Sequence, residues 1–114
     1  MDFNPDEIYK EVAKAGEEWA DFKAAYEALD DATKSVLADI TSHFIDGVLG
    51  KGGISKTEAE MRALSSGQYR THLAEKNAAR KAWLRSQVKY DSVKMLAGMR
   101  VTQESTRRAE MNIR

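Results

Sequence analysis

The chain has no cysteine and only one proline among its 114 residues. Without cysteine, disulfides, thiolate metal sites and cysteine nucleophiles are excluded. Aromatic residues make up 8% of the chain and charged residues 32%, so a compact sphere of this composition would have a thin core. No apolar run approaches the roughly 20 residues that span a membrane, and acids stand where a secretory signal would be basic. These absences favour an elongated cytoplasmic protein with no membrane partner.

The residues that are abundant, Ala, Glu, Lys, Leu and Arg, are typical of long helices and coiled coils. A first helix is predicted over about residues 5–47. Asn4 is a suitable N-cap, Pro5 suits the first helical position, Glu7 completes a capping box, and Phe3 can pack on Ile8 as a hydrophobic staple. Apolar residues then recur in alternating steps of four and three, the spacing of a coiled-coil seam: Ile8, Val12, Ala15, Trp19, Phe22, Tyr26, Leu29, Thr33, Val36, Ile40 and His43. The seam stays in phase across Asp30-Asp31, which favours one helix over two.

The rest of the chain predicts two further helices. After a glycine-rich loop at 48–54, Ser55 and Glu58 form a capping box for a short helix over 55–65. A third helix follows over about 67–112, with Ser65 able to cap it. Its thinner apolar face is expected to comprise Tyr69, Leu73, Ala79, Trp83, Tyr90, Val93, Leu96, Ala97 and Val101. The predicted fold class is therefore all-α: a long antiparallel, coiled-coil-like helical hairpin with a short helix in its connection, forming one domain over 1–114 and self-associating into a homo-oligomer.

Charge is balanced in total but divided along the chain. Residues 1–69 carry seven Lys/Arg against fourteen Asp/Glu, whereas residues 70–114 carry eleven against four. Such asymmetry indicates either that the two halves pair with each other or that the basic half meets a polyanion.

Signals for catalysis or for metal binding are poor. Gly50-Lys51 resembles the end of a P-loop, but Ile45 stands where the motif needs its first glycine and Gly52 stands where it needs Ser or Thr. His43 falls on the apolar seam, where a hydrogen-bonded or register-setting histidine is favoured over a metal ligand. We expect no enzymatic activity, no cofactor and no metal site.

The basic residues of the third helix are the candidate binding site. Lys81, Arg85 and Lys89 recur at a spacing of four and form one stripe, which can follow a phosphate backbone. Trp83 and Tyr90 could stack on unpaired bases, although core anchors on the helical seam are favoured. The predicted nucleic-acid contacts are Lys76, Arg80, Lys81, Arg85 and Lys89, with Arg107 and Arg108 as an auxiliary site.

Part of the chain resembles a known group. The stretch Thr57–Ser66, the following Tyr69-Arg70 and His72-Leu73, then Lys89-Tyr90-Asp91 and Glu104–Met111 resemble small helical proteins of phages and prophages. Their genes often lie near those of single-strand annealing proteins and exonucleases. The resemblance covers about residues 55–112 and implies a phage context inside a bacterial host, but it carries over no catalytic residue.

The function expected from these observations is that of a non-enzymatic phage accessory protein of DNA replication or recombination. It would bind DNA, a phage or host recombination or replication protein, or both, through its basic C-terminal helix. The alternative is a protein-interaction or inhibitory module that binds no nucleic acid, in which the acidic and basic helices pair internally.

Overall fold

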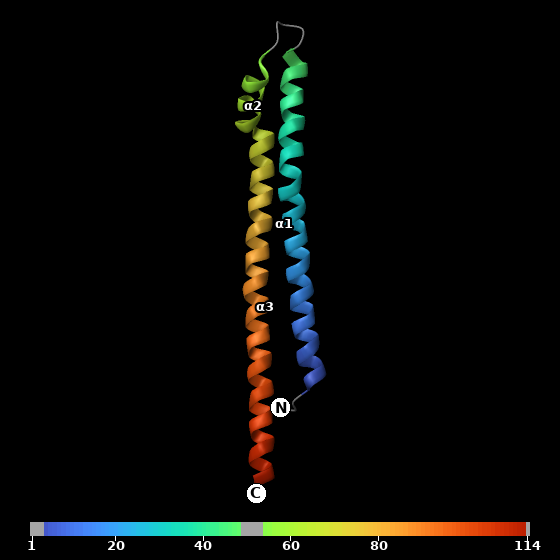
Figure 1. The fold of residues 1–114 in the computed structure, drawn as a ribbon, viewed down its shortest axis with the longest axis vertical. Helices are drawn as coiled ribbons and strands as arrows, with labels where there is room; N and C mark the ends of the chain where they lie inside the picture. The colour runs from blue at the N-terminus through green and yellow to red at the C-terminus, as the bar shows by residue number, and fades with distance from the viewer. Residues whose placement is uncertain (1–3, 49–53, 114) are drawn as a thin grey trace. The chain divides into compact units, whose positions relative to one another are not determined.

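The computed structural model describes residues 4–48 and 54–113, and nearly all of them are helical. Helix α1 runs over Pro5–Val48, the short helix α2 over Lys56–Leu64 and helix α3 over Gly67–Ile113 (Figure 1). The two long helices pack against each other and the described residues contain no strand, so the predicted all-α helical hairpin is confirmed. As expected, α1 is continuous through Asp30-Asp31.

Local capping explains where the helices begin. The Asn4 side-chain oxygen accepts hydrogen bonds from the backbone N–H groups of Asp6 (3.1 Å) and Glu7 (3.4 Å), and the Ser55 hydroxyl accepts one from Glu58 (3.1 Å). These bonds satisfy donors that the first turn of a helix leaves without partners. At the start of α3, Ser66 accepts from the Tyr69 N–H (3.2 Å), so the prediction of Ser65 as this cap is wrong by one residue.

The contacts divide the chain into two compact units, Met1–Lys23 with Ala82–Arg114 and Ala24–Lys81. In each unit, one segment of α1 packs antiparallel to one segment of α3. The expectation of a single domain over 1–114 stays a prediction. The predicted Phe3–Ile8 staple and the Gly50-Lys51 loop lie outside the described residues.

The first unit is centred on a close approach between α1 and α3. A Cβ atom built on Gly16 would lie only 3.1 Å from Tyr90 Cζ, so the missing side chain admits the tyrosine ring. Tyr90 also packs on Trp19, with ring centroids 6.0 Å apart and tilted by 37°, an ordinary geometry for an aromatic pair. Lys23 and Lys94 place their ammonium groups over these rings, 5.2 Å from Trp19 and 4.3 Å from Tyr90.

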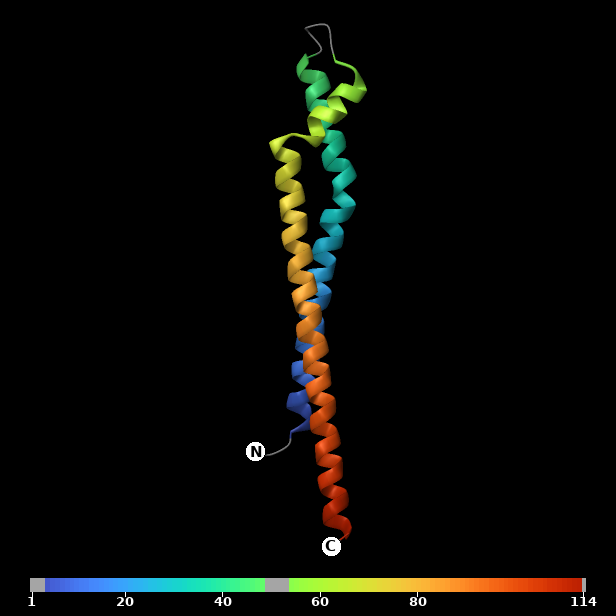
Figure 2. The same cartoon turned by 90° about the vertical axis from the view of Figure 1, so that its left-hand side faces the viewer.

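Toward its C-terminus, α3 continues past the beginning of α1, and this extension has no helix beside it (Figures 1 and 2). From Val101 to Asn112 every residue except Glu104 is exposed. Leu96 and Val101, which were expected on the apolar face of α3, lie beside Ile8 of α1 but stay about half exposed.

The second unit contains α2 and a buried polar contact. Ala59 and Ala63 of α2 are fully buried; the small alanine side chains let this helix pack closely where it crosses α1 (Figure 2). Between α1 and α3, His72 is buried and its Nε2 lies 3.0 Å from the Thr33 hydroxyl. His43, which was predicted on the seam, is exposed. The histidine buried in a hydrogen bond is therefore His72, and the prediction for His43 is wrong.

The contact between Gly16 and Tyr90 predicts opposite effects of substitution at two helical glycines. Gly16→Leu forces the tyrosine ring out of its position and lowers the free energy of unfolding by about 1–3 kcal/mol. Gly98→Ala meets nothing within 4 Å and raises the free energy of unfolding by about 0.5–1 kcal/mol, because alanine is the better helix former. Urea denaturation followed by circular dichroism measures both effects. A Gly16→Leu variant as stable as the wild type would contradict the close approach.

Candidate nucleic-acid interface

The predicted basic contacts differ in whether α1 neutralises them. In the second unit, Lys76 Nζ lies 2.7 Å from an Asp30 carboxylate oxygen, and the lysine side chain is only 21% exposed. In the first unit, Lys89 donates a hydrogen bond of 2.9 Å to Glu18. Two of the five cations predicted as the main nucleic-acid contacts therefore pair with acids of α1.

These ion pairs shift the titration of their partners. The hydrogen bond to Asp30 raises the pKa of Lys76, with partial burial acting in the opposite direction. The hydrogen bond and charge of Lys89 lower the pKa of Glu18. Both shifts favour the charged forms in the folded protein. Asp30 and Lys89 are at least half exposed, so solvent weakens both ion pairs. Each pair therefore contributes more to the register of the two helices than to stability.

The other cations of the stripe remain exposed. Arg80 and Lys81 in the second unit, and Arg85 in the first, are exposed and make no ion pair with any described residue. Lys76 and Arg80, four residues apart, are neighbours on one face of their helix, and so are Arg85 and Lys89. The cations that a phosphate backbone can reach most directly are therefore Arg80, Lys81 and Arg85.

The auxiliary pair lies on the solvent-surrounded end of α3. Arg108 is 3.5 Å from Glu104 one turn earlier, whereas Arg107 is exposed and has no ion pair among the described residues. The sequence did not single out Arg100, whose guanidinium lies 3.9 Å from Glu11 of α1. Arg100 and Glu11 meet because the two helices pack antiparallel in this register. Residue spacing along one helix cannot predict this contact.

The two aromatic residues considered for base stacking belong to the helix interface. Tyr90 lies against Gly16 and Trp19, and Trp83 is half-buried with its indole nitrogen inaccessible. Their expected role as core anchors is confirmed. The indole N–H of Trp19 is buried as well and finds no hydrogen-bond partner among the described residues.

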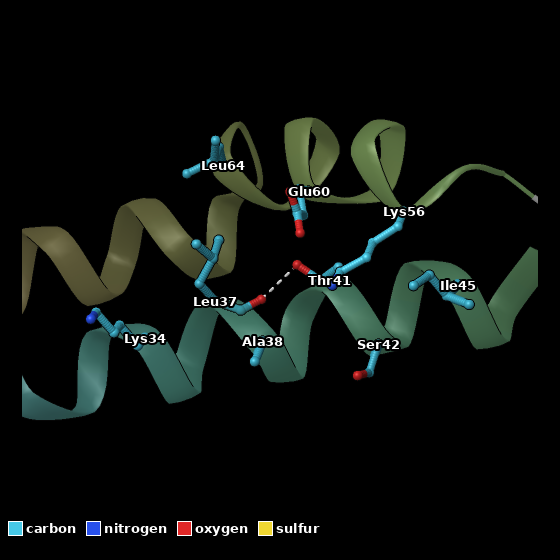
Figure 3. Close-up of a pocket in the computed structure, with 9 residues that line it drawn as sticks. All are labelled: Lys34, Leu37, Ala38, Thr41, Ser42, Ile45, Lys56, Glu60 and Leu64. Carbon is cyan, nitrogen blue, oxygen red and sulfur yellow. Dashed lines mark hydrogen bonds between the residues drawn. The ribbon is translucent and has the colours of Figure 1, made fainter.

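A groove lies between α1 and α2 in the second unit (Figure 3). Its volume is about 400 Å³. Leu37 and Ile45 supply apolar lining from α1, while Lys56 and Glu60 extend from α2 toward α1. The Thr41 hydroxyl is held by the Leu37 carbonyl oxygen (2.7 Å) and is not available as a reactive group. The groove therefore combines an apolar lining with polar ends of Lys56 and Glu60 directed toward Thr41 (Figure 3).

Within residues 4–48 and 54–113, no three His, Asp or Glu side chains gather closely enough to hold a metal ion. Over the same residues no helix is both long and apolar enough to cross a membrane.

Comparison with known proteins finds no matching family model and no significantly similar curated protein or solved structure.

The ion pair between Glu18 and Lys89 predicts a pH dependence of stability. Since the pKa of Glu18 is lower in the folded protein than in the unfolded chain, its stabilising effect is present above the ordinary carboxyl pKa of about 4.3 and is lost as the pH falls through the lowered value. Glu18→Gln removes this contribution and flattens the decline in melting temperature between about pH 5 and pH 3. Glu17→Gln is the matched control, because Glu17 is exposed and makes no ion pair among the described residues. Equal pH profiles for the two variants would show that the pair does not form in solution.

Proposed function

We propose that this protein is a non-enzymatic nucleic-acid-binding protein whose helix α3 holds the phosphate backbone. The observation that carries the proposal is the exposure of Arg80, Lys81 and Arg85 without acids to neutralise them. Each such cation can displace a condensed counterion from DNA, which favours binding without base-specific contacts. Arg107 adds a further exposed cation.

The resemblance of residues 55–112 to small phage proteins supports a more specific role. On that basis we propose that the protein serves phage DNA replication or recombination inside a bacterial host. The acids of α1 hold Lys76 and Lys89, so DNA would first contact Arg80, Lys81 and Arg85.

The proposal is tested by the salt dependence of DNA binding. Combining Arg80→Gln, Lys81→Gln and Arg85→Gln removes three phosphate contacts. The negative slope of log K against log salt should become shallower by about 2–3. The matched control combines Lys10→Gln, Lys14→Gln and Lys34→Gln, which changes the net charge equally at exposed positions of α1. Fluorescence anisotropy with labelled single- and double-stranded DNA, at several salt concentrations, measures both variants. An equal loss in the control would show that net charge alone drives binding, and no DNA binding by the wild type at low salt would sink the proposal.

A second candidate function follows from the ion pairs between α1 and α3. Part of the basic charge of α3 is neutralised by acids of α1, in the pairs Asp30–Lys76, Glu18–Lys89 and Glu11–Arg100. Such internal pairing is expected of a protein-interaction or inhibitory module. Glu18→Gln separates the two candidates. It frees Lys89, so a DNA-binding protein should bind DNA more tightly, whereas an internally paired module should change only in stability.

A further inference from the structure

The face of α3 that points away from α1 carries large apolar side chains in the first unit. Leu84, Val88, Met95 and Met99 are between 44% and 66% exposed. Their spacings are four, seven and four residues, so at about 100° per residue they lie within an arc of roughly 60°. We call these four residues the outer stripe.

Among the described residues of the first unit, none covers the outer stripe. The face of α3 that meets α1 includes Ser86, which is buried, and Tyr90, which packs on Gly16. Each is two residues from Val88, which places it on roughly the opposite side of the helix. The stripe is therefore separate from the seam that joins the two helices.

The outer stripe contains a gap into which a side chain of a partner helix can insert. Gly98 leaves open space beside Met95 and Met99, and the resulting shallow groove, bounded further along by Thr102, has a volume of about 480 Å³. A gap between long side chains is where a side chain of a facing helix inserts. Methionine side chains adapt their shape to such a partner.

Charge beside the stripe indicates the kind of partner. Residues 82–103 contain Arg85, Lys89, Lys94 and Arg100 against the single acid Asp91, which lies between Val88 and Met95 and pairs with Lys94 at 3.5 Å. Lys89 and Arg100 pair with acids of α1, yet more than half of each side chain stays exposed. A second copy docked through the same face would bring these cations together, and like charges oppose such a contact. An acidic helix would instead meet a net positive charge, with Arg85 exposed and without an ion pair among the described residues.

We propose that the outer stripe is the docking site for an acidic amphipathic α-helix of another protein. The helix would place apolar residues at intervals of three and four on Leu84, Val88, Met95 and Met99, the usual arrangement of a helix bound along an apolar surface. Its acids would lie beside Arg85. The inference does not depend on DNA binding, because none of the four apolar residues is a proposed phosphate contact.

The test uses a labelled synthetic peptide of about three heptads, with Leu at positions a and d and Glu at the flanking e and g positions. The control peptide carries Lys in place of each flanking Glu. We expect the wild-type protein to bind the acidic peptide at least about tenfold more tightly than the basic one. The combined substitutions Met95→Gln and Met99→Gln should weaken acidic-peptide binding by about tenfold or more. Fluorescence anisotropy measures these affinities, and circular dichroism verifies that the variant remains helical.

Met111→Gln is the matched control, because Met111 is equally exposed on α3 but lies at least about 120° around the helix from Met95 and Met99. It should leave peptide binding unchanged. DNA binding by the Met95→Gln, Met99→Gln variant should also equal that of the wild type.

Four results would overturn the assignment. Equal binding of both peptides would remove the charge argument, and retention of binding by the Met95→Gln, Met99→Gln variant would place the peptide elsewhere. A wild-type dimer in sedimentation equilibrium that this variant dissociates would assign the stripe to a second copy. Binding to vesicles of anionic phospholipid that the variant loses would assign it to a lipid surface.

Discussion

A pair of helices can bury only one face of each, and this limit governs the molecule. Among the described residues, the buried apolar side chains are few and mostly small: Ile8, Ala15, Ile40, Ala59 and Ala63. Larger residues such as Trp19 and Trp83 are only half-buried. Specificity of pairing must therefore come from shape and from polar contacts, since the buried apolar area alone would allow the helices to slide. The tyrosine over Gly16 and the histidine bonded to Thr33 provide such fixed points, one in each unit.

The same limit shapes the charge distribution. Along the edges of each helix pair, acids of α1 meet lysines and an arginine of α3, so part of the opposite charge of the two halves is used inside the molecule. Positions on α3 that point farther from α1 have no acid opposite them, and there both basic and apolar side chains remain exposed. Internal pairing and external binding are therefore compatible, because they use different residues of one helix.

Much of the fold could be predicted because its signals are local. The cap at Ser55 and the four-and-three spacing of α1 depend on residues within a few positions of each other, and they gave the helices nearly their observed bounds. The wrong predictions concern side chains whose burial depends on which residues of the other helix lie opposite them. His43 continues the seam in spacing yet is exposed, whereas His72 is buried because Thr33 lies opposite it. For the candidate site, spacing identified the cations but not which of them an acid of α1 would hold. The outer stripe was missed because the aromatic repeat at Trp83 and Tyr90 marks the other face of α3 more strongly.

The extension of α3 past the beginning of α1 has a kinetic consequence. An isolated helix of about a dozen residues is marginal in water, and from Val101 onward almost every side chain is exposed. Amide hydrogens in this segment should therefore exchange with solvent far sooner than those around Tyr90, because the segment makes little contact with α1 beyond Val101. The binding free energy of a partner at this segment must offset the conformational entropy that the segment loses on ordering. The dissociation rate of such a partner should therefore depend on the helix propensity of these last turns more than its association rate does.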